Sequence, residues 1–95
     1  MAMVVGVLQM RILVRDAQSL KDKRRVVRSL KDRIRNDFNV SVSEVDALDQ
    51  RQTAILGVTL ATNDRKFADE VLAKVVDFVR RAPEGQLVDY EVEFL

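Results

Sequence analysis

Cysteine and histidine are both absent from this chain of 95 residues. Without thiols it can form no disulfide, thiolate nucleophile, zinc finger or iron–sulfur site. Without imidazole it lacks the side chain most often used for acid–base catalysis. Tryptophan is absent too and aromatic residues make up 5%, so a core must be built mainly from Val, Leu and Ile.

Long hydrophobic runs are missing as well, since none approaches the roughly 20 residues that cross a bilayer. The segment 1–14 is apolar but includes Gln9 and Arg11. It has no basic leader or small-residue cleavage site, so we expect a strand and not a signal peptide. We therefore expect a cytoplasmic protein without a membrane partner, folded as one domain over residues 1–95.

Alternating apolar and polar residues predict four strands, and apolar residues at helical spacing predict two helices. The strands are expected over 3–15, 38–46, 52–62 and 87–94, the helices over about 20–37 and from residue 64 to just before Pro83. The order β-α-β-β-α-β predicts an α+β ferredoxin-like sandwich. In it, two helices cover one face of a four-stranded antiparallel sheet with strand order 4-1-3-2.

The helix starts carry capping residues. Ser19 is the expected N-cap of the first helix, with Asp22 three residues later in place of the more usual Glu or Gln. Thr62 or Asn63 is expected to cap the second helix, and Phe67 to begin its buried stripe.

Charge is unevenly distributed. The net charge is only +1, but ten of the sixteen cations lie between residues 11 and 35. A spacing of 3, 4, 3, 4 places one series of cations on a single flank of the first helix, beside its apolar stripe of Leu20, Val27, Leu30 and Ile34. That series is Lys21, Arg24, Arg28, Lys31 and Arg35.

Like charges at this spacing repel, so a row of them indicates a polyanionic partner. Guanidinium groups suit phosphates because they bind them in a bidentate way. The predicted nucleic-acid-binding residues are Lys21, Lys23, Arg24, Arg25, Arg28, Lys31 and Arg35. Two other interpretations stay open: a solvated helix face, and a surface for a protein or membrane partner.

The uncovered face of the sheet offers a second surface. RNA-binding sheets of this architecture use aromatic platforms on the first and third strands. Here the corresponding residues are Gln9, Arg11, Thr53, Ile55, Gly57 and Thr59. A face of such small residues suits packing against another protein, so a homodimer through this face or a sheet edge is the alternative.

Other patterns predict no chemistry. Asp89, Glu91 and Glu93 alternate on the last strand, and we expect them to pair with Arg11 and Arg15 instead of holding a metal. No phosphate-binding glycine motif is present. We therefore predict no catalytic residue, no cofactor, no metal and no small-molecule substrate.

Three segments carry a family resemblance. They are Ser19-Leu20-Lys21-Asp22-Lys23-Arg24, then Arg35-Asn36-Asp37-Phe38-Asn39-Val40-Ser41-Val42, then Glu44-Val45, Asp49, Gln52 and Gly57. Together they resemble the YlxP-like family of small bacterial proteins of unknown function. One departure is Arg51, where relatives often carry a tryptophan. The resemblance implies a ferredoxin-like fold, no established enzyme activity and an association with translation and ribosome maturation.

Two hypotheses result. The first is a non-enzymatic binding module that contacts RNA or a ribosomal particle through its basic first helix. The second is a homo-oligomeric structural or adaptor protein that binds protein partners through its sheet face.

Overall fold

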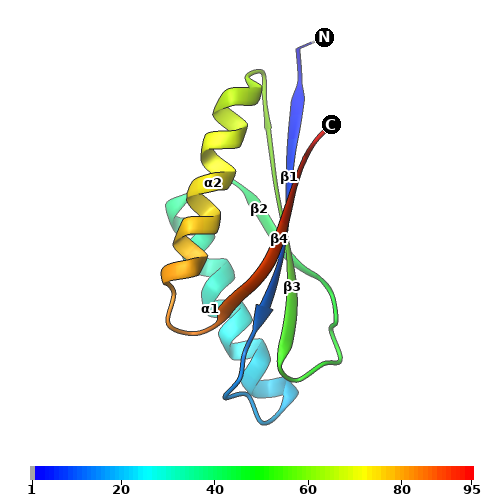
Figure 1. Cartoon of the computed structure of the whole chain (residues 1–95), viewed down its shortest axis with the longest axis vertical. Helices are drawn as coiled ribbons and strands as arrows, with labels where there is room; N and C mark the ends of the chain where they lie inside the picture. Colours follow the sequence, from blue (N-terminus) through cyan, green and yellow to red (C-terminus); the bar gives the residue numbers. More distant parts are fainter. Residues whose placement is uncertain (1) are drawn as a thin grey trace.

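The computed structural model describes residues 2–95 and confirms the βαββαβ order (Figure 1). The elements are β1 (Val4–Leu13), α1 (Leu20–Asp37), β2 (Ser41–Asp46), β3 (Thr53–Thr62), α2 (Arg65–Arg81) and β4 (Gln86–Phe94). All strand pairs are antiparallel, in the order β2-β3-β1-β4, which is the predicted one. Both helices lie on one side of the sheet and leave the other side bare (Figure 1).

The core lies between the helices and the sheet. Leu8, Met10 and Ile12 alternate along β1 with exposed residues, and all three are fully buried. Leu56 and Val58 on β3 are also fully buried, beside them in the sheet. The two-residue period of the central strands therefore marks the helix-facing side, as the alternation predicted.

The two helices cover different parts of the sheet. α1 packs on the β2 side, whereas α2 packs over β1, β4 and β3. They are also offset along the strands, so the first turns of α2 have no helix beside them (Figure 1). The molecule is accordingly elongated, with extents of 47 × 22 × 20 Å.

Ser19 caps α1 as predicted, because its Oγ accepts a hydrogen bond from Asp22 N at 3.1 Å. The Asp22 carboxylate in turn accepts from the backbone of Gln18, one residue before the cap. In α2 the cap is Asp64, whose Oδ1 accepts from the backbone of Lys66 and Phe67. The prediction of a Thr62 or Asn63 cap was wrong.

Three further expectations are corrected. Phe67 is 51% exposed, because the turn that carries it lies beyond the reach of α1. The second strand begins at Ser41 and not at residue 38, because Phe38 still belongs to the helix end, where its N–H bonds to Ile34 O. β1 is also shorter at both ends than the predicted 3–15.

Candidate nucleic-acid interface

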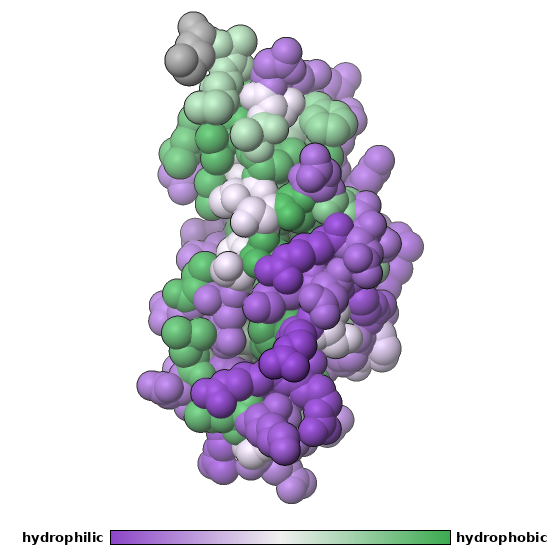
Figure 2. Space-filling view, turned by 180° about the vertical axis from the view of Figure 1, so that it is seen from behind, coloured by the Kyte–Doolittle hydropathy of each residue, from purple (hydrophilic) through white to green (hydrophobic). Residues whose placement is uncertain are grey.

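One flank of α1 carries an exposed row of cations. Lys21, Arg24, Arg25 and Arg28 are exposed and Lys31 is half-buried. Seen from behind, the strongly hydrophilic side chains gather over this side of the molecule, next to the more apolar sheet (Figure 2). These five residues are called the basic flank below.

The positive charges of the basic flank are not neutralised by ion pairs with acidic side chains of the described residues. Within residues 2–95 there are four ion pairs, and none of them includes a residue of the basic flank. The positive potential of the flank therefore faces solvent directly. This is the arrangement that attracts a polyanion.

Arg35 extends the row but has a structural contact. Its Nη2 donates to the backbone oxygen of Val42 on edge strand β2 at 2.8 Å, and its Nη1 lies 3.6 Å from Asp32. The Arg35 side chain is still 47% exposed. Arg35 thus ties the end of α1 to β2 and places the basic flank along that edge of the sheet.

Lys23 lies outside this surface, which corrects its predicted place among the exposed cations. Its side chain is 0% exposed. Its Nζ donates to the backbone oxygens of Ala47 at 2.8 Å, Leu48 at 3.3 Å and Thr53 at 3.2 Å. It also lies 2.9 Å from Glu44 Oε2. Lys23 therefore has no free donor for an external ligand.

The sequence did contain a signal for the burial of Lys23. With Val27, Leu30 and Ile34 it follows the spacing 4, 3, 4 of the buried stripe. Leu20, which was assigned to that stripe, is only half-buried at the first residue of α1. The charge of Lys23 suggested a surface position. The side chain can be buried because carbonyls of the β2–β3 loop accept hydrogen bonds from its ammonium group.

Residues that carry the family resemblance fix the β1–α1 and β2–β3 loops, which lie near the start of α1. Gln52 Nε2 donates to the backbone oxygens of Arg15 and Ala17, which ties the β2–β3 loop to the β1–α1 loop. Ala47 adopts a left-handed conformation with φ of 57°, and its carbonyl faces Lys23. Ser19, Lys23, Glu44 and Gln52 therefore stabilise the fold, and the basic flank projects from the helix that they anchor.

An ion pair links α1 to the loop after α2. Arg33 Nη1 donates to both carboxylate oxygens of Glu84, at 2.6 Å for Oε1, and Ser29 Oγ donates to Oε2. The hydrogen bond from Arg33 lowers the pKa of Glu84, and the same contact raises the pKa of Arg33. Arg33 also lies over the Phe78 ring at 5.1 Å, so it is engaged within the fold.

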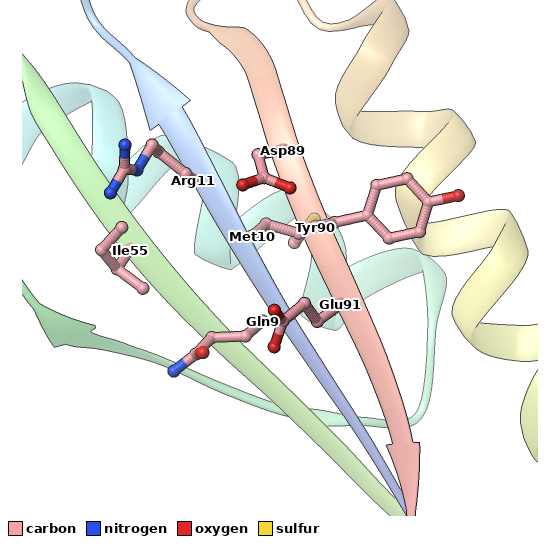
Figure 3. A pocket seen from close by; sticks show the side chains of 7 residues that line it. All are labelled: Gln9, Met10, Arg11, Ile55, Asp89, Tyr90 and Glu91. Carbon is pink, nitrogen blue, oxygen red and sulfur yellow. The ribbon is translucent and has the colours of Figure 1, made fainter.

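The bare sheet face has a shallow hollow of about 140 Å³ over β1, β3 and β4 (Figure 3). Arg11 lies opposite Asp89 in the β1–β4 register, but its guanidinium points toward β3 (Figure 3). The expected ion pairs of Arg11 and Arg15 with the acids of β4 do not form within the described residues. Residues 2–95 contain no cluster of acidic side chains placed to hold a metal ion.

Together, the fold and the charge distribution define a small ferredoxin-like α+β domain with one basic helix flank. A family model described as "Protein of unknown function (DUF503)" matches residues 5–92. The chain belongs to this family. It is 32% identical over 81 residues to the uncharacterized protein YlxP of Bacillus subtilis strain 168, covering 85% of this chain and 88% of that protein. The predicted YlxP-like membership is thereby confirmed.

Two solved structures support the fold. The de novo designed protein Foldit4 matches with a TM-score of 0.54 at 13% identity, covering 98% of this chain and 96% of the design. The de novo designed protein Ferredog-Diesel matches with a TM-score of 0.50 at 10% identity, covering 94% and 83%. At these identities the likeness concerns the fold alone. None of the described helices is long and apolar enough to span a membrane.

Proposed function

We propose that this protein is a non-enzymatic cytoplasmic module that binds structured RNA through the basic flank of α1. The observation that carries the proposal is that five cations on one helix flank lack any acidic partner within the described residues. α1 has 18 residues and is about 27 Å long, so its flank can follow several phosphates of a backbone. Arg35 lies at its far end, 47% exposed.

RNA is preferred over other polyanions because the family resemblance implies an association with translation. The bare sheet face lacks the stacked aromatics of sheet-based RNA recognition, so contact through phosphates is the mode that the chain supports. Such contacts position a protein on RNA with little dependence on sequence. An adaptor that oligomerises through the sheet face stays a prediction.

Binding of a structured RNA should fall steeply with salt. Each phosphate contact contributes a slope of about 0.7–0.9 in a plot of log K against log salt, because counterions are released. We expect the Arg24→Ala/Arg28→Ala/Lys31→Ala variant to bind more weakly and to lose about two to three from the slope. Fluorescence anisotropy over a salt series measures both quantities.

A matched control removes the same charge from α2. Lys66→Ala/Lys74→Ala/Arg81→Ala also loses three cations, and it should keep the affinity and slope of the unaltered protein. Duplex DNA of the same length tests the choice of RNA. No binding at low salt, equal losses in the two triple variants, or tighter binding to DNA would each contradict the proposal.

A further inference from the structure

Strand β4 is the other edge of the sheet and is unusually open. Its neighbour on one side is β1, and no strand of residues 2–95 lies on the other side (Figure 1). Val88, Tyr90 and Val92 are 49%, 42% and 38% exposed, although Tyr90 and Val92 pair with the buried Met10 and Leu8 on the helix-facing side. α2 packs against β4 but therefore leaves these three side chains partly exposed.

The backbone of β4 has free groups at its outer edge. Val5 and Leu95 exchange N–H···O bonds in both directions, at 3.1 and 2.9 Å. Such pairs recur at every second residue of an antiparallel ladder, so Asp89, Glu91 and Glu93 direct their backbone groups toward β1. The residues between them, Tyr90, Val92 and Phe94, direct their N–H and C=O groups outward. Edge groups of this kind accept an added strand.

The two faces of β4 specify the side chains that such a strand must carry. On the bare side, Glu91 and Glu93 lie opposite Gln9 and Val7 of β1, which provide no cation. On the helix side, Tyr90 and Val92 are apolar. Cations already lie there, because Arg80 sits over the Tyr90 ring at 5.5 Å and Arg65 over the Phe94 ring at 4.7 Å. The bare side favours basic partners and the helix side favours apolar ones.

We propose that β4 binds an extended peptide segment of alternating basic and apolar residues as a fifth strand of the sheet. In an antiparallel arrangement, the partner residues opposite Tyr90 and Val92 exchange backbone bonds with β4 and place apolar side chains over them. The residues opposite Glu91 and Glu93 fall at the non-hydrogen-bonded positions. There the strands approach to about 4.5 Å between Cα atoms, which brings the opposite charges closest.

A second copy of this chain is a poor occupant of the same edge. Antiparallel pairing of β4 with β4 keeps matching faces on the same side of the joined sheet. Asp89, Glu91 and Glu93 would then oppose the same acids of the other copy, which is unfavourable for directly opposed side chains. An RNA backbone is repelled by these acids in the same way. The charges favour a basic segment of another protein.

The probe is an acetylated and amidated peptide of about seven residues that alternates valine and lysine. We expect saturable binding by NMR titration, with the amides of Tyr90, Val92 and Phe94 shifting and becoming protected from exchange. N-methylation of the valines, whose N–H groups face β4, should abolish binding. N-methylation of the lysines, whose N–H groups point away, should leave it. A control peptide of the same composition, with all valines in one half and all lysines in the other, should not bind.

Variants of the protein supply the matching test. Glu91→Lys/Glu93→Lys should bind the lysine peptide about tenfold more weakly or worse and should bind a valine–glutamate peptide instead. Val92→Pro removes an outward N–H and should lose binding, whereas Val92→Ala should retain it. Equal binding of the two N-methylated peptides, no effect of charge reversal, or a dimer through β4 by light scattering would overturn the proposal. The comparison of the N-methylated peptides uses the unaltered protein, so it tests the proposal even where a variant fails to fold.

Discussion

Lys23 shows how a single residue can be charged and yet belong to the core. Its ammonium exchanges water for two carbonyls of the β2–β3 loop, the carbonyl of Thr53 at the start of β3 and the Glu44 carboxylate, and these contacts compensate its desolvation. The residue joins α1 to the β2–β3 loop, far apart in the sequence. The nearby residues that carry the family resemblance, Ser19, Glu44 and Gln52, likewise stabilise the fold.

Replacing Lys23 by methionine should therefore be strongly destabilising. The change leaves Glu44 and three carbonyls without their partner, and we expect a loss of about 3–5 kcal/mol in the free energy of unfolding. Chemical denaturation measures it. Lys21→Met on the exposed flank is the control and should change stability by about 0.5 kcal/mol or less. Similar effects for the two variants would show that the Lys23 contacts contribute little.

Among the elements, α1 and α2 touch only lightly and are joined by a polar contact at their C-terminal ends. Arg33 and Ser29 of α1 both bond to Glu84, in the loop after α2, beside the edge-to-face pair of Phe38 and Phe78. The hydrogen bond from Arg33 lowers the pKa of Glu84 in the folded protein. The ionised form is thus the one that holds the helices together.

A lowered pKa fixes the sign of the pH dependence. The contribution of Glu84 is fully present above the pKa of the unfolded carboxyl, about 4.3, and is lost as pH falls through the lower folded pKa. Glu84→Gln should be less stable than the unaltered protein at neutral pH, and the difference should shrink on acidification. Thermal melts across this range test it, with Glu70→Gln as an exposed control. A difference that stays constant with pH would refute the ionic origin.

At the scale of the whole molecule, the two proposed surfaces lie at opposite edges of the sheet. The basic flank follows the β2 edge, and the acids of β4 line the other. Three strand spacings separate these edges by about 14 Å. This exceeds the screening length of about 10 Å at 0.1 M salt. The net charge of +1 conceals this separation into a basic and an acidic side.

The two binding events should therefore be nearly independent. At 0.1 M salt, RNA and the valine–lysine peptide should bind together, each with its affinity changed by about twofold or less. The triple α1 variant should keep its peptide affinity, and the Glu91→Lys/Glu93→Lys variant should keep its RNA affinity. Titrating peptide into a preformed RNA complex measures the coupling. Competition between the two ligands would place them on one surface.

Prediction from the sequence succeeded where a pattern repeats over many residues. The alternation in β1 and β3 and the helical period of α1 predicted the elements, the strand order and most of the core. It failed at single positions whose environment comes from another segment. Asp64 replaced the predicted caps, Phe67 was exposed by the offset of the helices, and Lys23 was buried by a loop 24 residues away.

By itself, the sequence determined the fold class, the family and the clustering of cations on one helix flank, because periodicity and charge are local properties of the chain. Only the tertiary structure decided which cations are free. It buried Lys23, bound Arg33 to Glu84, tied Arg35 to β2 and left the basic flank without an ion pair among the described residues. It also left Val88, Tyr90 and Val92 of β4 partly exposed beside α2, since the position of the helix determines how far each side chain is covered. Burial and ion pairing depend on distances between segments, which a linear pattern does not contain.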